Sequence, residues 1–246
     1  MALVGLLWGS FLNVVAYRII RHESIAFPRS HCPHCNHTLA WYDLVPLFSW
    51  LALKGSCRYC AAPISFLYPF IELLTASLFV LLYNQFDLPY ILSYGLFFSA
   101  LIVSIRTDLE HLLISRLASL CLVPIGIMLA ISGWLPITGT ESCLGAIFGY
   151  ALLWGTAVAF KRITKKEGIG EGDFELMAMI GSFTGPMGVW LTITAGSLIG
   201  SIVSVVYLVI TKKAPNTKIP FGPFLALGAI VFVLYNQMIT TLMNQV

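Results

Sequence analysis

The sequence predicts an all-α integral membrane protein of about eight transmembrane helices, with one small polar domain between the first and second helix. Of its 246 residues, 58% are hydrophobic and 10% are charged, whereas about 25% of the residues of a soluble domain are charged. Apolar stretches of about twenty residues recur along the chain, and about twenty helical residues are needed to cross a bilayer core. The basic residues gather in alternate loops, as they do when Lys and Arg remain on the cytosolic side.

The chain divides into a first helix, a polar domain and a larger helical domain. Residues 1–17 carry no charge and lack the basic start of a secretory signal, so we expect a retained helix. Gly5 and Gly9 in this helix have the spacing that lets membrane helices approach closely. Residues 18–63 are expected to form the small cytosolic domain. Residues 64–246 are expected to form a seven-helix membrane domain, with spans at 64–83, 89–105, 117–135, 142–160, 174–186, 187–210 and 221–243.

The distribution of charge predicts the orientation of these spans. The opposite set of loops holds only the acids Asp87 and Glu141, and no basic residue. The positive-inside rule therefore puts the basic loops in the cytosol and both termini outside. All fourteen basic residues lie on the cytosolic side in this topology: Arg18, Arg21, Arg29, Lys54, Arg58, Arg106, Arg116, Lys161, Arg162, Lys165, Lys166, Lys212, Lys213 and Lys218.

Two CxxC pairs in the polar domain, Cys32 with Cys35 and Cys57 with Cys60, are separated by 21 residues. Two thiolates on a tight turn can bind one ion, and two such turns complete the tetrahedral four-sulfur shell of a structural zinc. A domain of about 45 residues has little core, so the metal would supply much of its folding free energy. One alternative is a disulfide arrangement, which the reducing cytosol disfavours. Another is a histidine in place of one cysteine, with three candidates: His31, His34 and His37.

Two aspartates occupy positions where a membrane protein rarely carries a charge without a function. Asp108 follows the third span, and Asp173 stands at the start of the sixth. At the cytosolic edge, two carboxylates on different helices could meet, share one proton and hold a water for attack on a peptide carbonyl. Gly170 and Gly172 would let a substrate backbone come close and let the chain bend before the helix. The alternative is that both acids are solvated at the interface, with Asp173 capping its helix.

Gly170-Glu171-Gly172-Asp173 matches the GxGD motif of intramembrane aspartyl peptidases, and the chain as a whole resembles the bacterial type IV prepilin peptidases. The order of motifs makes this resemblance specific, because the cysteine pairs come first, Asp108-Leu109-Glu110-His111 follows, and GxGD comes later. Four further segments carry the resemblance: residues 9–18 (GSFLNVVAYR), 41–47 (WYDLVPL), 68–75 (YPFIELLT) and 219–226 (IPFGPFLA).

The resemblance implies an activity, partners and cofactors. The activity is cleavage of the short basic leader of type IV prepilins or pseudopilins at the cytosolic membrane face, with Asp108 and Asp173 as the catalytic pair. Family members with the cysteine-bearing domain also methylate the new N-terminal amine with S-adenosylmethionine. No glycine-rich nucleotide loop in the sequence marks where this donor would bind. The expected partners are the prepilin or pseudopilin substrate and the lipid bilayer, with no nucleic acid.

Glu72 is an ionisable residue inside the second span, where a charge is costly and usually functional. We expect it to face the interior of the helix bundle. Three roles are open for it: substrate binding, methyl transfer or a structural hydrogen bond.

The chain departs from the family pattern near both aspartates. Glu175 stands where the family usually has Lys, and Ser115 and Arg116 stand where a Pro-Asp pair is common. These departures bear on substrate choice and pH optimum rather than on the type of reaction, because both carboxylates and both glycines remain.

Two other classes of function compete with the peptidase. A multi-pass transporter would hold its coupling acids near the bilayer midplane, whereas Asp108 and Asp173 are expected at one edge. A non-catalytic scaffold for pilus or secretion assembly, carrying a zinc knuckle, would tolerate loss of both aspartates.

Overall fold

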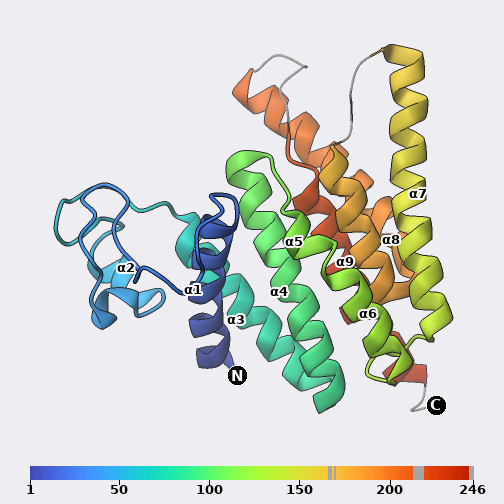
Figure 1. Cartoon of the computed structure of the whole chain (residues 1–246), viewed down its shortest axis with the longest axis horizontal. Coiled ribbons are helices and arrows are strands. Elements are labelled where there is room, and N and C mark those ends of the chain that lie inside the picture. The colour runs from blue at the N-terminus through green and yellow to red at the C-terminus, as the bar shows by residue number, and fades with distance from the viewer. Residues whose placement is uncertain (166–167, 169, 213–218, 244–246) are drawn as a thin grey trace. The chain divides into compact units, whose positions relative to one another are not determined.

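The computed structural model describes residues 1–165, 168, 170–212 and 219–243, with side chains as far as residue 236. Three of the basic residues used to predict the orientation, Lys166, Lys213 and Lys218, lie outside this part of the chain. Helices form the regular structure of the described residues, and β-structure there is limited to two isolated bridges. The chain forms two compact units, Met1–Phe86 and Asp87–Val246, which we describe separately (Figure 1).

Unit 1 is built on two long helices, α1 (Ala2–Ile19) and α3 (Leu67–Gln85), which pack against each other. Gly5 and Gly9 make this packing close, as their spacing predicts: a Cβ on Gly5 would lie 2.6 Å from the Cα of Ala76. The polar segment between the two helices carries the short elements η1 (Trp41–Leu44) and α2 (Phe48–Ala52). Helix α3 thus belongs to unit 1, while a functional boundary at residue 64 remains a prediction.

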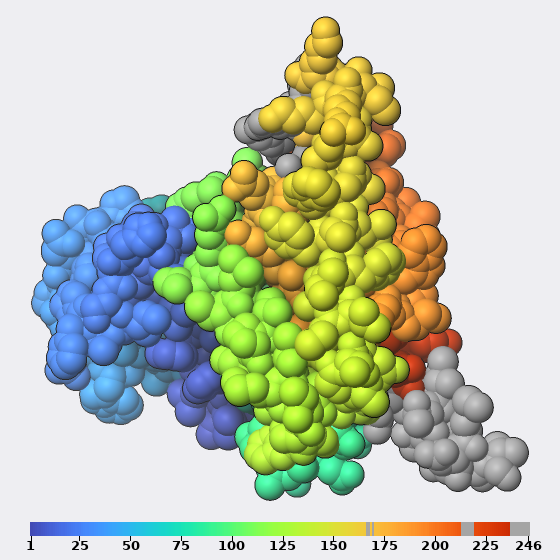
Figure 2. Space-filling view, turned by 45° about the vertical axis from the view of Figure 1, so that its right-hand side comes forward, coloured from blue at the N-terminus to red at the C-terminus, as the bar shows by residue number. Residues whose placement is uncertain are grey.

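Unit 2 contains α4 (Leu88–His111), α5 (Arg116–Ser119), α6 (Leu122–Ile131), α7 (Gly139–Thr164), α8 (Glu171–Thr211) and α9 (Gly222–Met243). Helix α7 begins at a capping box in which Thr138 and Glu141 bind each other's backbone N–H groups. Helices α7 and α8 then run antiparallel, with Gly145 beside Gly181 and Gly149 beside Met177. The last turns of α7, which carry Lys161 and Arg162, project beyond the neighbouring helices of unit 2 (Figure 2).

Helix α8 is interrupted at Gly185, where the sequence predicts a division between two spans. Gly185 has φ 70° and ψ −178°, which no helix contains, and Pro186 follows it. Before the break, Gly172 lies against Ile114. After it, a Cβ on Gly196 would lie 3.0 Å from the carbonyl oxygen of Phe224, near the start of α9. The two halves of α8 therefore run in opposite directions, as the predicted division requires (Figure 1).

The membrane character of the chain follows from its helices. Five helices of the described part are long and apolar enough to cross a bilayer by themselves. The described parts of α5–α6 and α9, at 116–131 and 222–236, are apolar but shorter, so a total of eight spans remains a prediction. The five long helices are α1, α3, α4, α7 and α8.

Gly145 gives a test of the contact between α7 and α8. A side chain there would meet the backbone of Gly181 and Gly185, so we expect Gly145→Leu to lower the free energy of unfolding by about 1–3 kcal/mol or more. The matched control is Gly155→Leu on the same helix, where a Cβ has nothing within 4 Å. Thermal unfolding in detergent would measure both, and equal losses would contradict this helix contact.

Candidate functional site

The four cysteines of the polar segment come together in unit 1. Their sulfur atoms all lie within 4.8 Å of one another, and the Sγ atoms of Cys32 and Cys60 are 3.8 Å apart. None of the six cysteines of the chain is in a disulfide, so the disulfide arrangement is not formed. Among the described residues no histidine joins the group, which leaves four thiols as the set that could hold a metal ion.

The two cysteine turns have the same backbone geometry. Asn36 N donates to Cys32 O at 2.9 Å, and Ala61 N donates to Cys57 O at the same distance. The residue that closes each turn has a positive φ, 55° at Asn36 and 57° at Ala61. Each turn therefore bends back after its second cysteine and directs two thiols toward the shared centre.

Asp43 ties the helical turn η1 to the second cysteine turn. Its side chain is 3% exposed and accepts hydrogen bonds from Arg58 Nε at 2.7 Å and from the Tyr59 hydroxyl at 3.2 Å. Burial raises the pKa of the Asp43 carboxyl, but the hydrogen bonds and charge of Arg58 outweigh it and hold this pKa below its ordinary value. The contact therefore stabilises unit 1 above the ordinary aspartate pKa, and the stabilisation is lost as the pH falls through the lowered one.

Asp108 lies in the last turn of α4, because this helix continues to His111 instead of ending near residue 105 as predicted. The aspartate is 6% exposed, and its Oδ2 accepts a hydrogen bond of 2.9 Å from the backbone N–H of Gly222, the first residue of α9. A Cβ on Gly222 would lie 2.8 Å from that oxygen. The contact between α4 and α9 at this point therefore needs a residue without a side chain.

Asp173 lies in the first turn of α8 and is 9% exposed. A Cβ on Gly172 would lie 2.9 Å from the Cβ of Ile114, so this glycine lets α8 begin close to the segment that follows α4. Gly170 precedes the helix with φ −74° and ψ 150°, values open to any residue, so bending there does not need glycine. The atom nearest to a Cβ on Gly170 would be Asp173 Oδ2, at 3.5 Å.

The two aspartates come together at one end of unit 2, where α4 ends and α8 and α9 begin (Figure 1). They are close enough for the charge of Asp108 to act on Asp173. Deeper in the unit, the rings of Phe97 on α4 and Phe183 on α8 stack with centroids 4.7 Å apart. Two buried carboxyls whose charges act on each other can divide the acid and base work of a hydrolysis between them.

The departures from the family pattern at residues 116 and 175 form one ion pair. Arg116 Nε lies 2.9 Å from Glu175 Oε1, and its Nη2 lies 3.0 Å from Glu171 Oε2. The Arg116 side chain is 68% exposed, whereas that of Glu175 is 8% exposed. Ser115 is the N-cap residue of α5, the helix that carries Arg116. Arg116 therefore joins α5 to the start of α8 through two acids that lie on either side of Asp173 in sequence.

Glu72 belongs to unit 1 and the two aspartates to unit 2. It is 6% exposed, as expected of an acid that faces the interior. Its Oε2 accepts a hydrogen bond of 2.7 Å from Leu47 N, and its side chain also binds Ser10.

Two features of these sites were missed by sequence reasoning. The sequence shows Gly222 only as part of a family segment, and nothing local indicates that its N–H binds Asp108. The sequence presents Arg116 and Glu175 as separate departures from the family pattern, and only their opposite charges indicate that they could form a pair.

A charge exchange tests the link between α5 and α8. In R116D an acid faces Glu171 and Glu175, and in E175K a base faces Arg116, so we expect each single variant to lose about 1–2 kcal/mol of unfolding free energy. The double variant R116D/E175K restores opposite charges and should recover most of that loss. Thermal unfolding measures this, with E171K as the control, since the exposed pair it breaks contributes about 0.5 kcal/mol or less. If R116D/E175K is no more stable than the less stable of the two single variants, charge complementarity between residues 116 and 175 is excluded.

Two family models match the chain. The model described as Bacterial Peptidase A24 N-terminal domain covers residues 3–86, and the model described as Type IV leader peptidase family covers residues 95–205. The first match coincides closely with unit 1, and the second lies in unit 2 and includes both aspartates. No solved structure matches the chain significantly.

Curated relatives match over nearly the whole length. The chain is 35% identical to a prepilin leader peptidase/N-methyltransferase of Stutzerimonas stutzeri, covering 96% of this chain and 90% of the relative. It is 34% identical to the protein of the same name in Pseudomonas aeruginosa, covering 97% and 90%. It is 36% identical to a type 4 prepilin-like proteins leader peptide-processing enzyme of Escherichia coli, covering 93% and 90%. The chain therefore belongs to the type IV leader peptidase family.

Proposed function

We propose that this chain is a membrane-embedded aspartyl endopeptidase that cleaves the leader peptides of type IV prepilins or pseudopilins. The observation that carries the proposal is the approach of two buried aspartates, Asp108 and Asp173, from different helices at one end of unit 2. The family and the names of the relatives, which refer to prepilin leader peptides, support the class of substrate.

Asp108 and Asp173 perform the proton transfers of peptide hydrolysis. Two carboxyls at short range favour a state with one shared proton, because like charges oppose double ionisation. The ionised aspartate takes a proton from the attacking water, and the protonated one donates to the carbonyl oxygen of the substrate. The C–N bond then breaks as the leaving amine takes up the proton that the first aspartate removed from the water. The hydroxyl formed from the carbonyl oxygen returns its proton to the second aspartate, so the pair ends with one proton, as it began. The Gly222 N–H keeps the Asp108 carboxylate oriented during these steps.

The aspartate end of unit 2 faces the cytosol. Arg106 and Arg116 lie beside Asp108 in sequence, and Lys161, Arg162 and Lys165 lie where α7 ends. Basic residues at one end of a membrane helix bundle favour the cytosolic side. The same rule applied to the polar segment of unit 1 puts the N-terminus outside. Helix α9 begins beside Asp108, so its far end and the C-terminus also lie outside.

The four-cysteine group holds a structural zinc ion. The distance of 3.8 Å between the Cys32 and Cys60 sulfurs matches the edge of a tetrahedron whose metal–sulfur bonds are about 2.3 Å long. Zinc bound there joins the two cysteine turns, which have little hydrophobic core between them, and so stabilises the fold of the polar segment.

The chain also methylates the N-terminal amine of the cut pilin with S-adenosylmethionine as donor. The names of the relatives, which include N-methyltransferase, support this second activity.

Acids gathered at one end of unit 2 argue against a transporter, whose coupling site would lie near the midplane.

Asparagine at either aspartate tests the peptidase mechanism. Asp108→Asn and Asp173→Asn keep the side-chain volume but remove a group that transfers protons, so we expect each to lower the rate of leader cleavage by about 100-fold or more. The assay is co-expression with a tagged prepilin, followed by the size of the pilin.

The control for this assay is Asp87→Asn, an exposed acid before α4, which should leave cleavage unchanged. Shortened pilin at the normal rate from either active-site variant would rule out the paired mechanism. A wild-type chain that cleaves no prepilin would instead favour a non-catalytic assembly protein.

The metal site is tested by changing two thiols. We expect purified protein to contain about one zinc per chain and the C57S/C60S variant to contain none, because two thiolates do not complete the shell. Elemental analysis measures the zinc, and a lower unfolding temperature should accompany its loss. Cys121→Ser, outside the cluster, is the matched control. Zinc retained in the double variant would exclude four-sulfur coordination.

A further inference from the structure

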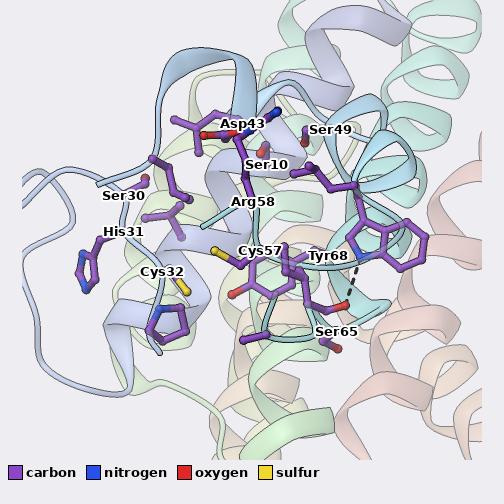
Figure 3. Close-up of a pocket in the computed structure, with 18 of the residues that line it drawn as sticks. Ser10, Ser30, His31, Cys32, Asp43, Ser49, Cys57, Arg58, Ser65 and Tyr68 are labelled. Atoms are coloured by element: carbon purple, nitrogen blue, oxygen red, sulfur yellow. Dashed lines mark hydrogen bonds and ion pairs between the residues drawn. The ribbon is translucent and has the colours of Figure 1, made fainter. Parts of the chain in front are cut away.

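Unit 1 contains a cavity of about 340 Å³ between α1, α3 and the cysteine-bearing segment (Figure 3). Cavities of about 300–1,000 Å³ are typical of small-molecule sites. Its wall is largely apolar and aromatic, and polar groups reach it from all three elements. The polar and aromatic residues of the wall include Ser10, Tyr17, Arg18, Asp43, Trp50, Tyr68 and Glu72.

Glu72 is a carboxylate in this wall without a counter-charge. It is 6% exposed, and its two described contacts are the Leu47 N–H and the Ser10 side chain. None of the ion pairs formed by the described residues includes Glu72. A buried charge without an opposite charge is costly, so the position favours a ligand that brings a positive charge.

The other charged groups of the wall have partners. Asp43 is paired with Arg58. The Arg18 guanidinium donates to three backbone carbonyls, at Ser24, Ile25 and Pro28. Neither Arg18 nor Glu72 is in an ion pair among the described residues, but the positive charge of Arg18 is satisfied by these carbonyls. Among its described residues, the wall therefore has its one unmatched negative charge at Glu72.

The backbone around Glu72 holds the carboxylate in place. Leu47 has φ 64° and ψ −52°, and Phe48 N donates to Pro46 O at 2.7 Å, so these residues form a γ-turn of a rare, strained kind. The Glu72 hydrogen bond to Leu47 N supports this turn. On the α1 side, a Cβ on Gly9 would lie 2.8 Å from Glu72 Cα. The close packing of α1 against α3 therefore fixes how far the Glu72 carboxylate reaches into the cavity. Strain of this kind occurs often at binding sites.

We propose that this cavity binds S-adenosylmethionine, with the Glu72 carboxylate facing the positively charged sulfonium. The inference rests on the proposed methyltransferase function and names the site that serves it. The sulfonium charge is permanent, so S-adenosylmethionine cannot become neutral by losing a proton when it enters an apolar cavity. It therefore needs an opposite charge in the cavity, and the fixed Glu72 carboxylate supplies one. The rings of Tyr17, Trp50 and Tyr68 supply flat surfaces for the adenine.

The bound donor supplies one methyl group: an N–C bond forms to the acceptor amine, the S–C bond breaks with its electron pair left on sulfur, and the amine gives up one proton to solvent. Glu72 attracts the charged donor but not the neutral thioether that remains. The residue therefore favours binding of the donor and release of the product.

Binding to the full chain in detergent, measured by calorimetry, tests the site. Wild-type protein should bind S-adenosylmethionine more tightly than the neutral product S-adenosylhomocysteine. Glu72→Gln can still accept the Leu47 hydrogen bond but has no charge, so we expect its affinity for S-adenosylmethionine to fall about tenfold or more. Its affinity for S-adenosylhomocysteine should stay within about threefold of wild type. The control is Glu23→Gln, an exposed acid outside the cavity wall, which should leave both affinities unchanged.

Several further results would overturn the inference. Equal binding of S-adenosylmethionine by wild type and Glu72→Gln would exclude a role for the charge. Ultraviolet cross-linking of radiolabelled S-adenosylmethionine to wild-type chain needs no variant, and label recovered in residues 87–246 instead of 10–72 would exclude this cavity. If the wild-type chain cleaves prepilin but binds no S-adenosylmethionine, this inference fails and the peptidase proposal stands. If it does neither, both fail.

Discussion

The hydrogen bond from the Gly222 N–H to Asp108 joins the last turn of α4 to the first turn of α9, and the arrangement of unit 2 depends on this contact. Helix α9 packs along the second half of α8, where Gly196 lies against the start of α9. The first half of α8 carries Asp173 and returns to the same end because the helix reverses at Gly185. The aspartate pair is therefore built by three helices, and the glycines are the points where their backbones meet.

The same type of contact organises unit 1. Glu72 accepts a hydrogen bond from Leu47 N, just before α2, as Asp108 accepts one from Gly222 N at the start of α9. In each unit a buried carboxylate binds the backbone N–H at which a following element begins. Such N–H groups have no partner within their own helix, and an anion there is favoured. Each acid thus connects elements that are distant in sequence. The same hydrogen bond fixes the position of one of its two carboxylate oxygens.

The ion pair of Arg116 and Glu175 changes the meaning of two departures from the family pattern. Considered singly, an acid two residues after Asp173 and a base in place of an acid at residue 116 would each alter the local field. Together they preserve an attraction between α5 and α8, because the energy of two charges depends on the product of their signs. Glu175 is two residues after Asp173, so the pair helps to set the position of Asp173 at the start of α8.

Much of this architecture was predictable from local pattern. Apolar length, loop charge and the cysteine spacing indicate the helices, the break at Gly185–Pro186 and the four-thiol cluster, because each depends on residues near one another in the chain. Only the tertiary structure decided that α4 extends through Asp108, that Gly222, 114 residues away, binds it, and that Glu72 lies in a cavity wall with no opposite charge from the described residues. These features come from packing between distant helices, which local periodicity does not encode.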